Sequence, residues 1–581
     1  MRSKPLIELE NVTFTYPGVE VPVLTDVTLS INEGDFTAII GGNGSGKSTL
    51  CKTFNGLIPQ FYVGEFEGRV IANGLLAEDQ TVAQLSKNIG YVYQDFDNQL
   101  LRPTVIDDVC FTPLNYGLQD HKERGEWALK VTGLEDLRDE FIWQLSGGQK
   151  HLLALAGALA MKPKILVIDE PIAQLDPQHA KRIYDILRNL NIEYGMTIIV
   201  IEHHTEFIAN YCREVILMDK GRVLWKKTTK EALSRVAELM KHQIYPPQVT
   251  QAAQRLGIDM GKDDLYPTTL DEAITHFTQQ APSYKELRKH EPLHEEVKLR
   301  HQPIIQFQEV SLQYRTLKKT VKHALTDINI SCYEGDLITL VGNNGAGKSS
   351  LIKLITGIMR PSQGDVLIQG INTRKATPEK LSDFVSYVYQ KPEEMFIDDS
   401  VRKDIEYYLK ARKVQDYEVL VEKLLEDFSL VDIQHQDGRL LSGGQQRRAS
   451  LAIGAAMNPS IILLDEPTAN LDIATKKHMV HMLNKLRKHV KLVIVATHDM
   501  QLVSEWANRV IVMNQGRIMC DGDKHTVFGN NVLMEQAGLV PPQILQLSQR
   551  LKMEVPCHTV EEFITIWDQE GANLERSIEY T

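Results

Sequence analysis

Short apolar runs of four or five residues recur along the chain, and glycine or polar residues follow closely after each. They form two sets in the same order: Phe36–Ile40, 165–168 and Thr197–Ile201, then Leu337–Val341, 461–464 and 492–495. A continuous apolar run of this length predicts a strand that is buried on both faces of a parallel sheet. Because a helix-like run follows the first strand of each set, the pattern predicts an α/β fold with a parallel sheet in each half.

The two sets belong to a duplicated pattern that extends over the whole chain. Equivalent residues keep a nearly constant offset: 301 residues from Lys47 to Lys348, 296 from Ser146 to Ser442 and from Asp169 to Asp465, and 295 from His203 to His498. Such an offset predicts tandem copies of one domain, and 581 residues allow each copy its own core. We expect a first domain over 1–240, its tail and a linker over 241–302, a second domain over 303–535 and its tail over 536–581.

Both copies place a glycine-rich loop between the first strand and the following helix. The loops read GGNGSGKS over 41–48 and GNNGAGKS over 342–349, and both match the phosphate-binding motif G-x-x-x-x-G-K-[ST]. The glycines allow backbone N–H groups to surround a polyphosphate at a helix N-terminus, while the lysine reaches the β- and γ-phosphates and the serine binds Mg²⁺. The residues expected to bind nucleotide are Gly41, Asn43, Gly44, Gly46, Lys47, Ser48 and Thr49, and Gly342, Asn344, Gly345, Gly347, Lys348, Ser349 and Ser350.

Two adjacent acids end the second apolar strand of each set. They are Asp169 and Glu170 in the first copy and Asp465 and Glu466 in the second. Open α/β sheets bind ligands at the carboxyl ends of their strands, so these acids are expected at the nucleotide. The aspartates are expected to hold Mg²⁺ and the glutamates to polarise the attacking water as general bases.

A histidine follows the third apolar strand in each copy. His203 and His498 are expected to contact the γ-phosphate. In the first copy a second histidine, His204, comes directly after, and only the alignment with Thr497-His498-Asp499 selects His203.

Two further motifs complete the order of each copy: a glutamine after a β-like segment (Gln94 and Gln390) and the sequence LSGGQ (145–149 and 441–445). The ordered set resembles the ATP-binding cassette (ABC) ATPases over essentially all of both copies, and ordinary P-loop enzymes lack LSGGQ. The resemblance implies two tandem P-loop cassettes, each with a helical insert, 94–160 or 390–457, and a small C-terminal helical tail.

The resemblance also implies a head-to-tail pair of halves that binds two ATP molecules. Ser146 and Gly148 then complete the site of Lys348, and Ser442 and Gly444 complete that of Lys47. Further roles implied by the family fall on Gln94 and Gln390, which bind Mg²⁺ and link it to a membrane partner, and on Tyr16 and Tyr314, which stack on adenine. Loop polarity for the glutamines and edge-strand packing for the tyrosines are the plainer alternatives.

Two features resemble the ATPases of energy-coupling-factor transporters, which power uptake of vitamins and of cobalt or nickel. Gln94 is followed by Asp-Phe-Asp-Asn-Gln over 95–99, and each copy ends in a proline-led tail with a short amphipathic run, at 245–256 and 540–551. Similar tails pack together in that family, although a simple helical cap on each domain is the alternative. The resemblance implies a peripheral subunit at the cytoplasmic face of the membrane, with a transmembrane coupling component and a substrate-binding component as partners.

Composition separates this interpretation from two others. A net charge of −12 and a pI near 5.9 predict no nucleic-acid partner, and no apolar stretch approaches the ~20 residues that cross a bilayer. Soluble tandem cassettes that act on ribosomes carry a basic linker, whereas residues 226–303 hold 12 Lys and Arg against 11 Asp and Glu. Fused ATPases of sugar or peptide importers are the other alternative, and co-purification with membrane proteins is common to both kinds of importer.

The copies also differ at equivalent positions in and after the motifs. Lys150 and His151 follow the first LSGGQ, where the second copy has Gln446 and Arg447, and the second copy lacks Asp-Asn-Gln after Gln390. Both copies keep the lysine, acids and histidine, so both sites are expected to be competent. These differences leave open whether the two sites turn over equally.

Overall fold

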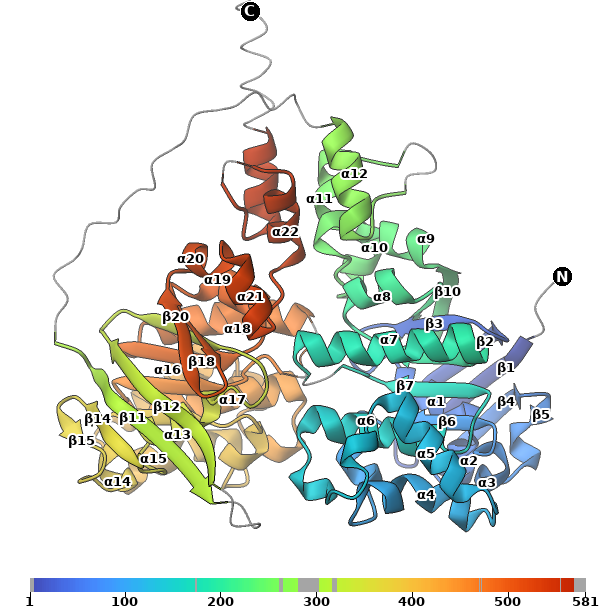
Figure 1. Ribbon diagram of the computed structural model, residues 1–581, viewed down its shortest axis with the longest axis horizontal. Coiled ribbons are helices and arrows are strands. Elements are labelled where there is room, and N and C mark those ends of the chain that lie inside the picture. The colour runs from blue at the N-terminus through green and yellow to red at the C-terminus, as the bar shows by residue number, and fades with distance from the viewer. Residues whose placement is uncertain are drawn as a thin grey trace, which may run out of the picture. The chain divides into compact units, whose positions relative to one another are not determined.

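The computed structural model describes residues 5–172, 175–260, 265–280, 302–315, 321–469, 471, 473–553 and 555–568 (Figure 1). The chain divides into two compact units, Met1–Pro282 with Phe563–Thr581, and Ser283–Glu562. Both units combine parallel sheets with helices, so the predicted tandem α/β fold is confirmed. The charged linker stretch from 288 to 301 lies outside the described residues.

The first unit is built on a six-stranded sheet in the order β10-β9-β3-β8-β7-β6, in which only β10 runs antiparallel to its neighbour. Its strands are β3 (Phe36–Ile40), β6 (Ile89–Val92), β7 (Ile165–Asp169), β8 (Thr197–Ile201), β9 (Glu214–Asp219) and β10 (Arg222–Thr228). An antiparallel sheet in the order β2-β1-β4-β5 accompanies it. Its strands are β1 (Pro5–Thr15), β2 (Leu24–Asn32), β4 (Glu65–Ala72) and β5 (Leu75–Leu76).

The second unit repeats both sheets. The larger has the order β16-β17-β18-β13-β19-β20, and the smaller β12-β11-β14-β15. The larger contains β13 (Leu337–Val341), β16 (Val385–Val388), β17 (Ile461–Asp465), β18 (Leu492–Thr497), β19 (Arg509–Asn514) and β20 (Arg517–Gly522). The smaller contains β11 (Ile305–Arg315), β12 (Val321–Cys332), β14 (Gln363–Ile368) and β15 (Ile371–Asn372). All six apolar runs singled out from the sequence therefore lie in strands.

Helices follow the same duplicated order. In the first unit they are α1 (Lys47–Phe54), α2 (Leu57–Gln60), α3 (Val82–Leu85), α4 (Val105–Asn115), α5 (His121–Thr132), α6 (Gly147–Leu159), α7 (Pro177–Tyr194), α8 (Thr205–Tyr211), α9 (Thr229–Ser234), α10 (Val236–Lys241), α11 (Gln248–Leu256) and α12 (Leu270–Gln280). In the second they are α13 (Lys348–Ile355), α14 (Pro378–Leu381), α15 (Val401–Ala411), α16 (Tyr417–Asp427), α17 (Gly443–Ala456), α18 (Ile473–Leu486), α19 (Met500–Trp506), α20 (Lys524–Phe528), α21 (Asn531–Ala537) and α22 (Gln543–Arg550). None of the helices in the described ranges is both long and apolar enough to cross a membrane.

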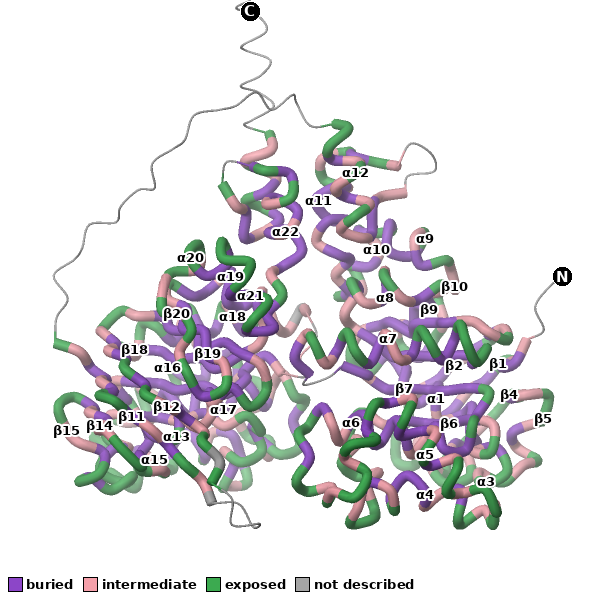
Figure 2. The backbone as a smooth tube through the Cα atoms, in the orientation of Figure 1, coloured by how far each residue is buried: buried purple, intermediate pink, exposed green. Residues whose placement is uncertain are grey.

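The central strands of the larger sheet are buried on both faces, as Figure 2 shows for β7. Successive residues of β7 face opposite sides because side chains alternate along a strand. Leu166 and Ile168 join the core formed with α6 and α7, whereas Ile165 and Val167 join the core formed with α1 and the smaller sheet. This two-sided burial explains why the strands read as unbroken apolar runs.

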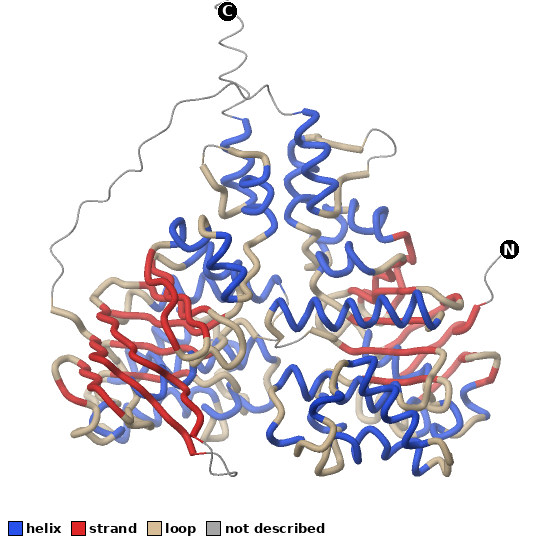
Figure 3. Tube along the Cα trace, viewed as in Figure 1, coloured by secondary structure: helices blue, strands red, loops and turns tan. Residues whose placement is uncertain are grey.

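Both proline-led tails fold into helices, drawn in blue in Figure 3. The final described helix, 560–568, belongs to the first unit from Phe563 onward. There the ring of Phe277 in α12 meets Phe563 at 5.5 Å and Trp567 at 5.2 Å between centroids, both edge to face. Phe277 and Phe563 are fully buried. Aromatic side chains from both tails therefore contact each other, as the family resemblance implies.

This aromatic contact supports a stability prediction. Phe563→Ala removes a fully buried ring, and such changes cost about 3–5 kcal/mol. We expect the backbone amides of α12 to exchange with solvent much faster in this variant, as measured by hydrogen exchange with mass spectrometry. Val555→Ala, at a half-exposed position of the same tail, is the matched control and should leave α12 protected. Unchanged exchange in α12 after Phe563→Ala would contradict a supporting role for the contact.

Candidate nucleotide sites

The phosphate loop of the first unit connects β3 to α1. Gly46 precedes α1 with a φ of 98°, a left-handed conformation that a side chain would strain, and a Cβ there would lie 2.9 Å from the carbonyl oxygen of Val23. Lys47 is only 7% exposed, and its Nζ donates to the carbonyl oxygens of Gly41 at 2.9 Å and Gly42 at 3.0 Å. The ammonium group is thus held inside the loop that the motif predicts for phosphate.

The second phosphate loop, between β13 and α13, has the same geometry. Gly347 has a φ of 107°, and Lys348 Nζ donates to the carbonyl oxygen of Gly342 at 2.6 Å. Lys348 Nζ also lies 3.8 Å from Glu466 Oε1, so the buried cation faces the proposed base directly. The glycines and lysine of each loop are therefore brought to the carboxyl edge of the larger sheet.

The loop serines and the strand-end aspartates meet in both units. Ser48 hydrogen-bonds to Asp169, and Ser349 hydrogen-bonds to Asp465. Burial, reinforced by the charge of the neighbouring glutamate, raises the pKa of each aspartate above its usual value despite these hydrogen bonds. In the second unit Tyr387 also donates to Asp465 Oδ2 at 3.2 Å.

Both proposed bases occupy a strained backbone conformation directly after the strand. Glu170 has a φ of 54° and Glu466 a φ of 49°, in the left-handed region that non-glycine residues seldom adopt. The same unusual geometry at the same place in two copies indicates a functional constraint on where these carboxylates lie. Each glutamate N–H is anchored by a carbonyl oxygen of the next strand, that of Ile201 or Ala496.

Each proposed base lies beside the histidine predicted to accompany it. His203 Nε2 is 3.3 Å from Glu170 Oε1, and Gln94 Nε2 donates to Glu170 Oε2 at 2.8 Å. In the second unit His498 Nδ1 is 3.0 Å from Glu466 Oε2. The first unit therefore brings base, histidine and glutamine together, whereas the contacts of the second base come from histidine and lysine.

Glu466 and His498 of the second unit shift each other's pKa. Burial alone raises the pKa of Glu466, but His498 and Lys348 outweigh burial and hold that pKa below its usual value. Burial alone lowers the pKa of His498, but the Glu466 carboxylate raises it above its usual value. The carboxylate and the imidazolium thus stabilise each other's charged form.

The two tyrosines assigned to adenine stand beside the start of the loop helix. The hydroxyl of Tyr16 is 3.4 Å from Thr49 Oγ1, and that of Tyr314 is 3.0 Å from Ser350 Oγ. This places an aromatic ring next to each nucleotide loop. Stacking on adenine stays a prediction.

The LSGGQ serines are the N-cap residues directly before α6 and α17. Ser146 accepts from the N–H of Gln149, whose side chain accepts from the Ser146 N–H, and Ser442 and Gln445 form the same capping box. Gly148 packs against His179 of α7, since a Cβ on it would lie 2.8 Å from that ring, and Gly444 packs similarly on Thr475. The proposed pairing of each LSGGQ with the other unit's loop stays a prediction.

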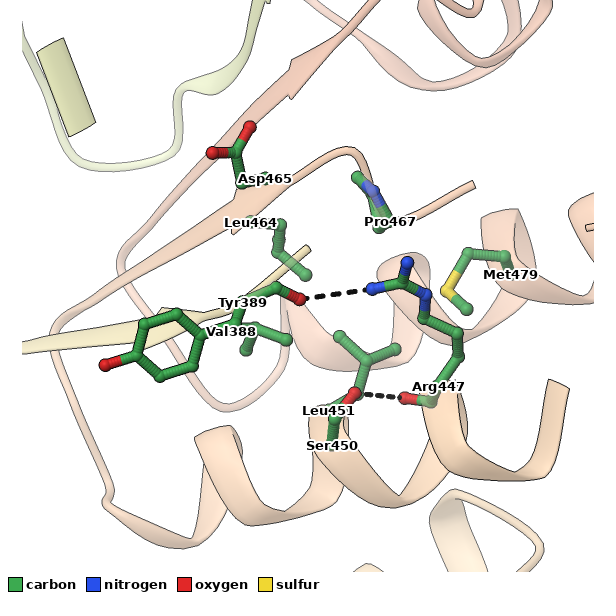
Figure 4. A pocket seen from close by; sticks show the side chains of 9 residues that line it. All are labelled: Val388, Tyr389, Arg447, Ser450, Leu451, Leu464, Asp465, Pro467 and Met479. Atoms are coloured by element: carbon green, nitrogen blue, oxygen red, sulfur yellow. Dashed lines mark hydrogen bonds between the residues drawn. The ribbon is translucent and has the colours of Figure 1, made fainter. Parts of the chain in front are cut away.

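Sequence reasoning missed side chains that tie each LSGGQ helix to the glutamine loop. In the second unit Arg447 lies in a pocket beside Asp465 and Met479, and its Nη1 donates to the carbonyl oxygen of Tyr389 at 3.1 Å (Figure 4). In the first unit His151 instead stacks on Phe96 of the loop, with ring centroids 4.5 Å apart.

A second tie in the first unit is electrostatic. Lys150 Nζ pairs with Asp97 Oδ1 at 3.0 Å. Burial lowers the pKa of His151 to about 4, so the stack beside this pair is neutral. The LSGGQ helix is therefore joined to the glutamine loop by an ion pair and a ring stack in the first unit, and by the hydrogen bond of Arg447 in the second.

Several known proteins are similar to this chain. Residues 24–173 and 325–469 match the family model described as ABC transporter. A putative ABC transporter ATP-binding protein of Methanosarcina mazei is 33% identical over 559 residues, covering 94% of this chain and 94% of that protein. One of Bacillus anthracis is 32% identical over 551 residues, covering 94% and 95%. A solved structure of cbiO1 from Clostridium perfringens, described as part of the ABC transporter complex cbiONQ, is 34% identical and covers 43% of this chain and 98% of that one, with a TM-score of 0.38.

The parallel sheet, phosphate loops and strand-end acids define a P-loop nucleoside-triphosphate hydrolase. Because both halves match the family model and the relatives match along nearly their whole length, the chain belongs to the ABC transporter ATP-binding family. It is an ATP-hydrolysing protein with two cassettes.

Proposed function

We propose that this chain is the ATPase subunit of an energy-coupling-factor importer that takes up a vitamin or a transition-metal ion. The observation that carries the proposal is the duplicated proline-led tail, whose helices contribute Phe277 and Phe563 to one buried aromatic contact. The acidic loop after Gln94, which the resemblance assigns to this transporter type, adds support. The chain then works at the cytoplasmic face of the membrane with a transmembrane coupling component and a substrate-binding component.

The site residues divide the work of hydrolysis. Lys47 and Lys348 bind the β- and γ-phosphates, and Glu170 and Glu466 act as general bases toward the attacking water. The hydroxyl and carboxylate oxygens of Ser48 with Asp169, and of Ser349 with Asp465, suit Mg²⁺, which prefers oxygen ligands. Gln94 and Gln390 add amide oxygens, and bound Mg²⁺ neutralises phosphate charge.

The same proposal includes a head-to-tail arrangement of the two cassettes. Ser442 and Gly444 then close on the γ-phosphate held by Lys47, and Ser146 and Gly148 on that held by Lys348. Each LSGGQ supports this role because it places the backbone N–H groups of its glycines at the N-terminus of a helix of 13 or 14 residues. Hydrolysis removes the contact that holds the cassettes together.

We propose that the membrane partner docks beside the loop at 97–99. The Asp97 side chain is 58% exposed while paired with Lys150 of the LSGGQ helix, so a docked segment would act on both the loop and the helix. Asp97→Ala should reduce co-purification of the chain with its membrane partners by several-fold. Asp79→Ala, another exposed acid of the first unit, is the matched control.

Identification of the membrane proteins recovered with the tagged chain tests the importer class. Recovery of a coupling component with a small substrate-binding membrane protein is expected, and ATP-driven uptake should require all three. The purified chain should not bind protein-free liposomes. Recovery with a sugar or peptide permease, or salt-sensitive binding to ribosomes, would contradict the proposal in favour of one of the other classes.

A further inference from the structure

A buried carboxylate stands directly before the histidine of the first site. Glu202 follows β8 and is 1% exposed. Its Oε1 accepts from the backbone N–H groups of His203 at 2.8 Å and His204 at 2.9 Å, and from His204 Nδ1 at 2.9 Å. Its Oε2 accepts from the hydroxyl of Tyr184 at 2.9 Å. All of these donors come from α7 or from the turn at 203–204, which we call the histidine turn.

This carboxylate is held as an anion. Burial by itself raises the pKa of Glu202, but the hydrogen bond and the charge of His204, with the backbone N–H donors, outweigh burial and lower that pKa. A buried charge is costly unless it is fully hydrogen-bonded, and here four donors satisfy two oxygens. A neutral side chain would fill the same space with a smaller desolvation free energy. We therefore looked for a function that needs the negative charge.

The hydrogen bonds of Glu202 fix the turn that aims His203. Two of them fix successive backbone N–H groups between β8 and α8, and the imidazole of His203 reaches Glu170 from this turn at 3.3 Å. Glu202 also accepts from Tyr184 of α7, and the ring of Tyr184 is held in place by stacking on Phe36 and Phe207. Through Glu202 and Tyr184, the buried aromatic side chains thus hold His203 in position.

In the second unit, different groups hold the turn that carries His498. Thr497 replaces the glutamate, and its Oγ1 accepts from the N–H of Asp499 at 3.0 Å. The Asp499 carboxylate accepts from the N–H groups of Gln501 and Leu502 and pairs with Lys476 Nζ at 3.1 Å. In this unit the charged anchor follows the histidine, whereas in the first unit it precedes the histidine.

We infer that Glu202 is a positioning residue for ATP hydrolysis at the first site, where it orients His203 toward Glu170 and the γ-phosphate. The inference rests on the proposed roles of His203 and Glu170. The first site then has a buried glutamate that positions its histidine, whereas the second site has Thr497 at the equivalent place.

The test measures single-turnover hydrolysis in a full-length chain carrying Glu466→Gln, so that the remaining hydrolysis comes from the first site. In this background Glu202→Gln keeps the shape of the side chain but removes its charge. We expect the hydrolysis rate to fall about 10-fold, because a small misplacement of a site group costs up to 10²-fold, while the Kd for ATP changes less than twofold. Tyr211→Phe, which removes a hydroxyl bonded to Asp185 from the same aromatic cluster, is the matched control and should stay within twofold.

The double variant Glu202→Gln with His203→Ala separates positioning from general stability. If Glu202 acts through His203, the double variant hydrolyses ATP no more slowly than His203→Ala alone. A rate for Glu202→Gln within twofold of the background, a Kd that weakens in step with the rate, or a further tenfold loss in the double variant would overturn the inference. If Glu202→Gln does not fold, Glu202→Thr, which installs the second unit's residue, takes its place in the same measurements. A normal rate for His203→Ala alone would instead refute the proposed role of the histidine.

Discussion

Replacing Glu170 and Glu466 together with glutamine is expected to slow ATP hydrolysis by about 100-fold or more. Glutamine has the shape of glutamate but cannot accept a proton from the attacking water. The lysines and serines of both phosphate loops are untouched, so ATP binding should survive and the ATP-bound state should accumulate. Steady-state hydrolysis and equilibrium ATP binding, measured on the same preparation, check both parts.

Two comparisons sharpen this experiment. Glu193→Gln changes an exposed acid of α7 and should leave turnover unchanged. The hydrolysis rates of the two single variants show how much each site contributes. The two bases have different contacts, because Glu466 lies 3.8 Å from Lys348, whereas Glu170 accepts from Gln94. Near-normal turnover in the double variant would rule out the base assignment for both residues.

Ser442→Arg is expected to disable the site of Lys47, although 395 positions separate the two residues. In the head-to-tail arrangement, an arginine at the start of α17 places bulk and charge where the γ-phosphate must fit, so closure fails while ATP stays bound. Combining Ser442→Arg with Lys47→Ala should add little, since both changes damage one composite site. Combining it with Lys348→Ala should abolish hydrolysis, since both sites are then damaged.

The mirror variant provides the control for this pattern. Ser146→Arg should be non-additive with Lys348→Ala and additive with Lys47→Ala. Hydrolysis rates of the four single variants and their pairs decide the question, together with ATP binding to confirm that each protein is folded. The opposite pairing would refute the head-to-tail arrangement and would leave each LSGGQ acting within its own cassette.

The sequence predicted the parts of each site that depend on local order along the chain. A glycine-rich loop between a buried strand and a helix, and acids at the end of a fully apolar strand, are set by strand and helix geometry, and Lys47 and Asp169 lie at the predicted edge of the sheet. The left-handed conformation of Glu170 carries no signal in residue type, because glutamate has no preference for positive φ.

Contacts between distant segments could not be predicted in the same way. Glu202 reads as the polar end of a strand, and its burial depends on Tyr184, 18 residues earlier in a different element. His151 reads as a polar residue of an amphipathic helix, yet it is 2% exposed because Phe96 covers it. The signal that was available for Glu202 is its charge beside two histidines, where the second copy has Thr497.

The aromatic contact in the first unit affects how this protein can be divided. Phe277 is covered by residues from the last described helix of the chain, so a fragment that ends at Pro282 would expose that ring to water. Halves expressed from separate genes would therefore have to exchange this segment between chains before the first half could bury its own surface. Covalent fusion supplies the segment at a high effective concentration, which makes the first half dependent on completed synthesis of the second.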